Sequence, residues 1–445
     1  MKKTINPELA GGFKDYLPED MIPRQKMFDV IRSTFELFGF LPLDTPGIEK
    51  ESVLTGGDDN FKMMMFKANL KEDEDEGLAL RFDLTVPLAR VISLYGDKIE
   101  KPFKRYQTGK VWRGEKPQAG RFREFVQFDA DIVGTDRMSA DAEIISLMFE
   151  TLNALKIDRF LIKINNRKIL NGLSSFAGYD QSLNVEVLRS IDKLDKIEWK
   201  GVAKELTGKG LNETQLNKLE KFINLKGESA EEILVNLSVL MACSPEALVG
   251  INELRQVVDN LKALNVPENF WQIDLSVARG LGYYTGPVFE TILLDLPNIG
   301  SVFSGGRYDD LVSRFGKQNI SGVGASIGVD RLFAALEKLS LIKKEKSVTK
   351  VLVLNFDESA EKYCQEVVSS IRKSGVAAEL YLGKETMLKS QLAYALKQEI
   401  PLVVIAGGSE MEKQMVQIKD LDKRIQEEVS FDQVTETVKR MLTLS

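Results

Sequence analysis

The chain has 445 residues, of which 43% are hydrophobic and 28% are charged, and its formal net charge is −6. This composition is typical of a globular protein and excludes the disordered class, and no apolar run reaches membrane-spanning length. The net charge argues against bulk electrostatic adhesion to nucleic acid, although it leaves room for a local basic surface fitted to one RNA.

The chain has no histidine, and its two cysteines, Cys243 and Cys364, lie far apart. A structural zinc site therefore lacks ligands, and neither a Cys-His nor a Ser-His-Asp nucleophile can be built. Any catalysis must come from carboxylates, arginines, backbone groups and a bound metal. The first residues run into Pro7 and two glycines instead of an apolar stretch, so we expect no signal peptide and a cytoplasmic protein.

The missing histidine also predicts how ligand-free stability depends on pH. Between about pH 5.5 and 7 no unperturbed side chain of this chain titrates, so the stability should be nearly constant. A marked slope would require a strongly perturbed carboxylate, for which Asp83, Glu115 and Asp131 are the candidates.

The first part of the chain is expected to alternate between helical and extended segments. Residues 18–38 carry apolar side chains at spacings near three and four, which predicts a helix that Gly39 ends. Asp83 and Thr85 are expected at a strand end, where both could face one side of a sheet, or else they cap the following helix. The other expected elements are an extended segment, two strands around an acidic loop, a long hairpin and a helix, at residues 40–46, 61–66, 78–82, 104–133 and 139–155.

A change of pattern marks a second part. Residues 167–265 have helical periodicity without a strong strand, which predicts a separate helical module. Residues 270–294 are strand-like, Gly305-Gly306 predicts a turn, and residues 322–329 predict a strand that leads into a helix. After a polar linker, strands alternate with helices as in an α/β domain of about a hundred residues. Its expected strands are residues 351–354, 377–381 and 402–406, and its helices begin near residues 360, 389 and 432.

Two segments could form part of a nucleotide site. Arg113 to Glu115 precedes a loop and Arg121 to Phe125 returns from it, so arginines and an aromatic ring could hold a triphosphate and a base. Taken alone, this segment is better explained as a hairpin with surface ion pairs. Gly322 to Arg331 places small residues on a strand, where a ligand or a helix could approach closely, and close packing of a helix is the favoured explanation of this segment alone.

A third segment, Ala278 to Glu290, is more specific, because an arginine beside two tyrosines between glycines resembles a pocket for a polar planar group next to an anion. Together and in this order, the segments resemble the motifs of class II aminoacyl-tRNA synthetases and, within that class, of the histidyl-tRNA synthetases. The resemblance covers nearly the whole chain. The matching stretches are the dimer motif, the second and third class motifs and three stretches of the histidine pocket, at residues 40–48, 105–131, 324–331, 80–90, 278–290 and 304–311.

The resemblance implies an α+β class II catalytic domain, an antiparallel sheet with helices, which carries a helical insertion and is followed by a C-terminal α/β anticodon-binding domain. The expected boundaries are those of the first catalytic part, the insertion, the second catalytic part, a linker and the anticodon-binding domain, at residues 1–166, 167–265, 266–340, 341–349 and 350–445.

The resemblance also implies ATP-dependent activation of L-histidine to histidyl-adenylate and transfer to the 3′ end of tRNA(His), by a homodimer that uses Mg²⁺ with ATP. Arg113 would hold the α-phosphate and the histidine carboxylate. Glu115 would contact adenine, Phe125 would stack on it, and Arg331 would cover its other face and the γ-phosphate. Arg121 would reach the outer phosphates, and no residue is expected to hold a metal by itself.

For histidine, the resemblance implies contacts with Asp83, Leu84, Thr85, Arg113, Gln127, Asp131, Arg279, Tyr283 and Tyr284. Arg279 and Arg113 would be the catalytic arginines, because attack of a carboxylate on the α-phosphate brings two anions together. Gln118 would read the extra guanosine at the tRNA acceptor end. Gly282 departs from the family pattern, in which an acidic residue precedes the tyrosine pair.

Three alternatives remain at this level. A catalytically inactive regulatory subunit, like the one that partners ATP phosphoribosyltransferase in histidine biosynthesis, generally lacks the anticodon domain and the catalytic arginines, whereas this chain keeps Arg113, Arg279, Arg331 and the segment from Lys350. An RNA-binding stress-sensing module would normally be attached to a kinase. A different class II specificity is opposed by the tyrosine pair.

Overall fold

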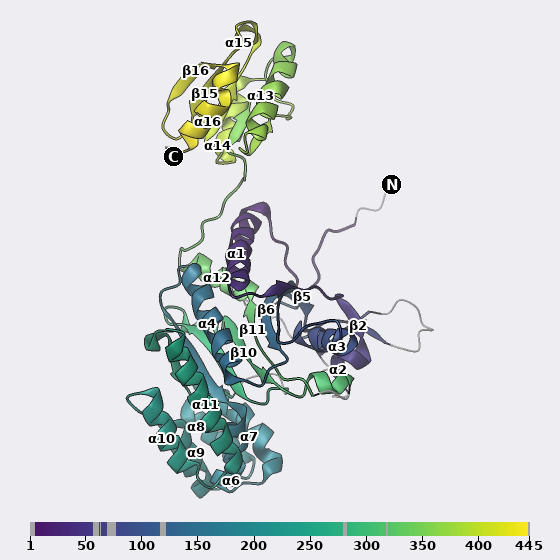
Figure 1. The fold of residues 1–445 in the computed structure, drawn as a ribbon. Helices are drawn as coiled ribbons and strands as arrows, with labels where there is room; N and C mark the ends of the chain where they lie inside the picture. Colours follow the sequence, from purple (N-terminus) through teal and green to yellow (C-terminus); the bar gives the residue numbers. More distant parts are fainter. Residues whose placement is uncertain are drawn as a thin grey trace. The chain divides into compact units, whose positions relative to one another are not determined.

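The computed structural model describes residues 5–56, 62, 64–68, 77–115, 122–278, 283–316 and 319–443 (Figure 1). It contains two compact units, of which unit 1 comprises Met1–Lys14 with Met27–Leu341 and unit 2 comprises Asp15–Lys26 with Ile342–Ser445. Within the described residues, no helix is long and apolar enough to cross a membrane.

Unit 1 is built on an eight-stranded sheet that is antiparallel in its middle and parallel at its two outermost pairs. The expected antiparallel sheet with helices is thus confirmed. Gly305 and Gly306 were predicted to form a turn, but they lie inside strand β10 and pair with β11 and β9, so that prediction is wrong. The strands, in sheet order, are β1 (Leu41–Pro42), β5 (Phe103–Trp112), β6 (Glu124–Val133), β11 (Gly322–Gly328), β10 (Phe303–Tyr308), β9 (Pro287–Leu293), β7 (Phe160–Asn166) and β8 (Trp271–Ile273).

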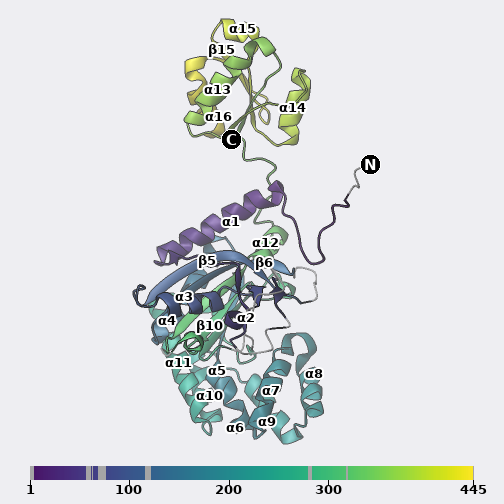
Figure 2. The same ribbon diagram turned by 90° about the vertical axis from the view of Figure 1, so that its right-hand side faces the viewer.

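One face of this sheet is apolar and packs against helices. Phe35, on helix α1 (Pro18–Leu37), contacts Phe128 of β6 with ring centroids 5.2 Å apart and Phe303 of β10 at 6.5 Å. Figure 2 shows α1 lying across β5 and β6. Helices α4 (Met138–Ala154) and α12 (Val329–Lys338) pack on the central strands. Because strand side chains alternate, the opposite face carries the polar residues of the same strands.

A small sheet, β2 (Ile48–Lys50), β4 (Leu78–Leu80) and β3 (Phe66–Lys67), precedes helix α3 (Thr85–Tyr95), and α2 (Glu51–Thr55) packs beside it. Strand β4 ends at Leu80, so Asp83 and Thr85 do not stand on a sheet face. Instead Asp83 Oδ1 accepts a hydrogen bond from the Val86 backbone N–H, 3.1 Å away, in the first turn of α3. The helix-capping alternative was therefore the correct one for this oxygen.

The helical module expected after β7 is present, and Figure 1 shows its helices gathered at one end of unit 1. Asn166 fixes its start, because its side chain accepts from the Lys168 N–H at 2.9 Å and donates to Glu253 at 2.8 Å. The module contains α5 (Arg167–Asn171), α6 (Leu173–Ala177), α7 (Asn184–Ile191), α8 (Leu194–Gly208), α9 (Glu213–Ile223), α10 (Ala230–Leu240) and α11 (Pro245–Ala263).

Unit 2 is an α/β unit with helices on both faces of a five-stranded sheet. The three expected strands form its parallel half, whereas the antiparallel hairpin β15–β16 was not predicted. The strands, in sheet order, are β13 (Ala378–Leu380), β12 (Val351–Val353), β14 (Leu402–Ile405), β15 (Met415–Asp420) and β16 (Gln426–Ser430), and the helices are α13 (Glu361–Lys373), α14 (Leu388–Lys397), α15 (Gly408–Glu412) and α16 (Val434–Thr443).

Candidate active site

The polar face of the large sheet carries two rows of cross-strand partners. Residues that pair across neighbouring antiparallel strands have their side chains on the same face of the sheet, and the residues of each row pair across β5, β6, β11 and β10. The rows are Arg105, Asp131, Gly324 and Gly306, and Gln107, Asp129, Ser326 and Ser304. A Cβ at Gly324 would lie 1.9 Å from Asp131 Oδ1, so this strand must lack a side chain there for the carboxylate to fit.

The Asp131 carboxylate, in the first row, has two side-chain partners. Arg105 Nη2 lies 2.7 Å from Asp131 Oδ2, and the Tyr308 hydroxyl donates to Oδ1 at 2.6 Å. Arg105 also donates to the Leu84 carbonyl at 3.1 Å, which ties the segment before α3 to the sheet. Burial raises the pKa of the Asp131 carboxyl, and Arg105 opposes that rise.

Two further carboxylates, Asp83 and Asp129, are buried at the same place, each 2% exposed. Burial raises the pKa of Asp83 to about 6 and that of Asp129 to about 7, while nearby arginines lower both. These raised pKa values favour the foreseen exception to a flat pH dependence. The exception applies to Asp83 and Asp131, whereas Asp129 and Asp141, on α4, were not foreseen.

Several buried polar atoms here have no hydrogen-bond partner among the described residues, namely Asp83 Oδ2, Asp129 Oδ1, Gln127 Oε1, and Arg105 Nε and Nη1. Buried polar groups in folded proteins are nearly always paired, and each exception needs an explanation. These atoms come from the segment before α3 and from strands β5 and β6, so they are well placed to bind one small polar ligand.

The tyrosine pair closes this acidic pocket. The rings of Tyr283 and Tyr284 meet edge to face with centroids 5.0 Å apart, and Tyr283 contacts Tyr308 at 6.2 Å. Burial raises the pKa of both phenols, and Asp83 and Asp129 add to the rise in each case, so the hydroxyls stay neutral. The side chain of Thr85 hydrogen-bonds to Tyr283.

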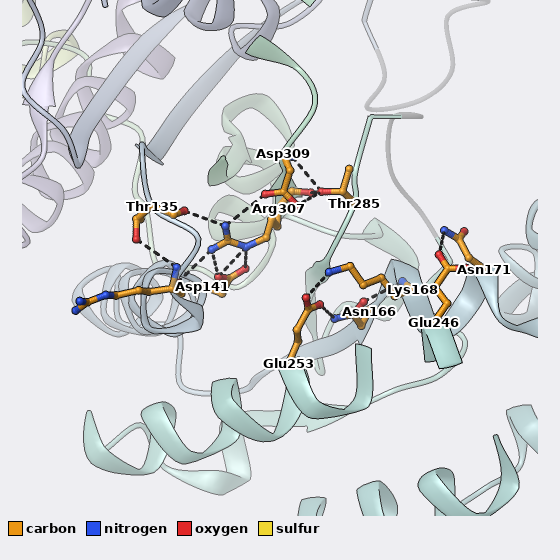
Figure 3. Close-up of polar contacts among 11 residues, drawn as sticks. Thr135, Asp141, Asn166, Lys168, Asn171, Glu246, Glu253, Thr285, Arg307 and Asp309 are labelled. Carbon is orange, nitrogen blue, oxygen red and sulfur yellow. Dashed lines mark hydrogen bonds and ion pairs between the residues drawn. The ribbon is translucent and has the colours of Figure 1, made fainter. Parts of the chain in front are cut away.

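Figure 3 shows what fixes the segment that carries these tyrosines. The Thr285 hydroxyl donates to Asp309 at 2.7 Å, and the Thr285 N–H donates to the Arg307 carbonyl at 2.9 Å. Arg307 itself points to the apolar face, where it is ion-paired with Asp141 of α4 and donates to the Thr135 carbonyl at 3.0 Å. Burial raises the pKa of Asp141 to about 6, and Arg307 opposes it.

Beside the acidic pocket lies a cavity of about 180 Å³. The Arg113 guanidinium lies over the Phe125 ring, 5.0 Å from its centroid, and donates to the Phe82 carbonyl at 3.1 Å. Arg331 lines the same cavity and donates to the Ser301 carbonyl at 2.5 Å. Two guanidinium groups and an aromatic ring around one cavity suit a planar ring attached to an anion.

The structure thus brings Arg113, Glu115, Phe125, Gln127 and Arg331 to one cavity. It places Asp83, Leu84, Thr85, Asp131, Tyr283 and Tyr284 around the neighbouring acidic pocket. Gln118, Arg121, Arg279 and Gly282 lie outside the described residues. Sequence reasoning gave no individual role to Arg105, Asp129, Tyr308, Ser304 or Ser326, although the motif stretches at residues 105–131, 304–311 and 324–331 contain them.

One of the missed residues had a readable signal. Asp129 stands between Gln127 and Asp131 at a spacing of two, which on a strand places all three on one face. For Arg105 and Ser326, membership of a motif stretch was the only signal in the sequence, because their place in the pocket depends on which strands become neighbours.

Comparison with known proteins gives two family matches. The model of the histidyl-tRNA synthetase family matches residues 12–332, and that of the anticodon-binding domain matches residues 350–441. The chain is 42% identical to a histidine–tRNA ligase of Clostridium tetani over 446 residues, covering 99% of this chain and 100% of the relative.

Solved structures agree. A crystal structure of the histidyl-tRNA synthetase of Nostoc sp. PCC 7120 matches with a TM-score of 0.87 and 33% identity, covering 98% of this chain and 100% of that one. A structure from Bacillus halodurans, described as an ATP phosphoribosyltransferase regulatory subunit/histidyl-tRNA synthetase, matches with a TM-score of 0.76 and 22% identity, covering 91% of this chain and 100% of that one. The second likeness shows a shared fold alone.

Proposed function

The chain belongs to the histidyl-tRNA synthetase family, and from this premise we propose which of its residues activate histidine. The activity is that of an aminoacyl-tRNA ligase, which uses ATP to attach histidine to tRNA. The observation that carries the residue assignment is the adjacency of two sites, an arginine-lined cavity and an acidic pocket whose buried polar atoms lack partners.

The cavity is the proposed ATP site. Phe125 stacks on adenine on one side and Arg331 covers the other, while Glu115 contacts the exocyclic amine. Arg113 holds the α-phosphate, since its guanidinium is already fixed over Phe125 and by the Phe82 carbonyl. Arg121, in the neighbouring loop, is proposed to reach the outer phosphates.

The acidic pocket is the proposed histidine site. Its carboxylates and amide suit the α-ammonium group and the imidazole nitrogens, because a site built to hydrogen-bond a polar ring rejects analogues that lack those groups. The neutral tyrosines line the ring. The residues assigned here are Asp83, Leu84, Thr85, Gln127, Asp131, Tyr283 and Tyr284.

In the first step the histidine carboxylate attacks the α-phosphate and pyrophosphate leaves, giving histidyl-adenylate. The two anions approach each other only if positive charge covers both, and Arg113 and Arg279 are proposed to supply it. Mg²⁺ bound with ATP would neutralise the triphosphate.

In the second step the activated histidine passes to the terminal ribose of tRNA(His). Gln118 is proposed to contact the acceptor end, and the domain at residues 350–445 to contact the anticodon, in line with the match to an anticodon-binding domain. The enzyme is proposed to be a homodimer. Because ribosomes consume its product, we place it in the cytoplasm. For the catalytic domain, insertion and linker we propose the boundaries expected from the sequence.

The test is amino-acid-dependent exchange of pyrophosphate into ATP with each of the twenty amino acids. Exchange with histidine alone, dependent on Mg²⁺, is the expected result. Exchange with another amino acid would refute the assignment of the pocket. No exchange with any would support the alternative of an inactive regulatory subunit.

A further inference from the structure

The acidic pocket contains one carboxylate that neither the fold nor the roles proposed above explain. Asp129 lies on β6 between Gln127 and Asp131, on the polar face of the sheet, and it is 2% exposed. Its cross-strand partner on β11, Ser326, lines the cavity and accepts a hydrogen bond from Gln127 at 2.6 Å. Asp129 is therefore directly beside the proposed reaction site.

The three carboxylates differ in their partners. Asp131 has an ion pair with Arg105 and a hydrogen bond from Tyr308, whereas Asp83 and Asp129 each have one oxygen without a hydrogen-bond partner among the described residues. Asp83 accepts from the N–H of Val86, and Asp129 forms no ion pair with any described residue. Burial raises the pKa of the Asp129 carboxyl, and the charge of Arg105 and a hydrogen bond with the Ser326 hydroxyl oppose that rise.

Among the described residues, no second cation forms an ion pair with Asp129. Arg81 is fixed elsewhere, since its guanidinium donates to the carbonyls of Thr45 at 2.6 Å and Lys110 at 3.0 Å. The groups that face or influence Asp129 are Arg105 on β5, Asp131 on β6, Ser326 on β11, Arg81 after β4, Asp83 before α3, and Tyr283 and Tyr284 before β9. Within the described part of the chain, the three buried acids share the charge of Arg105, and Arg113 acts on Asp83, so it is costly to ionise all three together.

We propose that Asp129 is a specificity-determining residue through which the pocket takes up histidine together with one proton, shared between the Asp129 carboxyl and the imidazole ring. This inference rests on the proposed histidine site. The α-ammonium group of histidine balances the negative charge of one unpaired carboxylate in the pocket, and the shared proton balances the charge of the other. When free histidine is neutral, above its ring pKa of about 6.5, solvent supplies the proton.

A consequence for selectivity follows from this proton. An amino acid whose ring has the shape of imidazole but is not protonated near neutral pH leaves Asp129 buried without compensation. Triazolylalanine is such a ligand. We expect the wild type to activate it about 10- to 100-fold less efficiently than histidine, the size of effect expected for an unmade hydrogen bond to a charged group.

The first test is calorimetric titration of the full-length protein with histidine, in two buffers of different ionisation enthalpy. At about pH 8 the wild type should take up about one proton, and this uptake should fall toward about pH 6. Asp129→Asn should take up none. Asp141→Asn removes a buried acid from the opposite face of the sheet, and this matched control should keep the uptake. Equal uptake by wild type and Asp129→Asn overturns the inference.

The second test compares histidine with triazolylalanine in pyrophosphate exchange. In Asp129→Asn the preference for histidine over triazolylalanine should fall by at least about tenfold, mainly because the KM for histidine rises. An unchanged preference overturns the inference. If this variant does not fold, the wild-type titration decides alone. A wild type that exchanges with histidine but takes up no proton at about pH 8 overturns the inference and leaves the proposed function standing.

Discussion

Two buried arginine–aspartate pairs lie on opposite faces of the same sheet, and they differ in how completely they are hydrogen-bonded. Arg307 uses all three of its guanidinium nitrogens, on Asp141 and on the carbonyls of Thr135 and Arg137. Arg105 pairs with Asp131 through one nitrogen, and its other two have no partner among the described residues. All guanidinium nitrogens of the first pair are therefore bonded within the protein, whereas the second pair has two nitrogens that a ligand could bind. Burial of an ion pair alone therefore does not mark a site, but incomplete pairing does.

The largest effect expected from the contrast between the two pairs is a loss of stability when Arg307 is replaced. Arg307→Met should lower the free energy of unfolding by about 3 to 5 kcal/mol, because Asp141 is then buried without compensation. Chemical denaturation measures it. The matched control is Arg159→Met, which removes an exposed pair with Asp295 at 2.7 Å and should cost at most about 1 kcal/mol. Similar losses in both variants would contradict the structural role of Arg307.

The same substitution on the other face should affect chemistry more than folding. Arg105→Met should lower kcat/KM for histidine in pyrophosphate exchange by about 100-fold, since it removes charge-assisted donors from the pocket. Its loss of stability should be smaller than that of Arg307→Met, because Arg105 is bonded within the fold through one guanidinium nitrogen, whereas Arg307 uses all three. A variant that is as unstable as Arg307→Met but fully active would reverse the comparison.

Buried carboxyl groups on both faces of the sheet make the stability of the ligand-free protein depend on pH. The pKa values of Asp83 and Asp141, about 6, and of Asp129, about 7, all lie above those of unfolded carboxyls. The folded chain therefore binds more protons than the unfolded chain between about pH 4 and 7, so stability should fall as the pH rises through this window, by on the order of 2 kcal/mol per carboxyl.

Denaturation at a series of pH values checks this slope, and each aspartate changed in turn to asparagine should make it shallower. The absence of histidine makes the measurement clean, because no imidazole titrates in the same window. A slope of the opposite sign would mean that these carboxyls are ionised in the folded protein throughout.

The smallest expected effect concerns the segment between the two faces. Thr285→Val removes the hydroxyl that donates to Asp309 and should cost about 0.5 to 1.5 kcal/mol of stability. Because Thr285 follows the tyrosine pair directly, the KM for histidine should rise while kcat changes little. Thr207→Val, which removes an exposed hydroxyl bond to the Ala203 carbonyl within α8, is the control and should leave KM unchanged.

Much of the fold could be predicted from local patterns. Apolar spacing predicted α1, and the alternation of residues 104–133 predicted the hairpin β5–β6. The hairpin β15–β16 was missed because its turn, residues 421–425, contains none of the glycine, proline or asparagine that usually mark one. Gly305 and Gly306 were misread because they serve close packing inside a strand, where Pro287 O and the Tyr284 ring leave no space for a side chain at Gly306.

The candidate site was predictable to a smaller degree. Motif resemblance named Arg113, Gln127 and Arg331, which line one cavity. It did not name Arg105, because the partners of a buried arginine depend on contacts far apart in the sequence. Asp141 and Arg307 are likewise 166 residues apart, and no periodicity within either segment indicates their pairing.

The position of the pocket strands within the sheet predicts how often different parts of the protein unfold locally. β6, β11 and β10 are each hydrogen-bonded on both sides, whereas β5 pairs with β6 along its length and with β1 only at Arg105 and Tyr106. Amide hydrogens in such central strands exchange with solvent only through rare, extensive unfolding, whereas peripheral segments exchange through frequent small openings. The floor beneath the acidic pocket should thus keep its shape through many cycles of turnover, and ligands should enter and leave by movement of the segments around it.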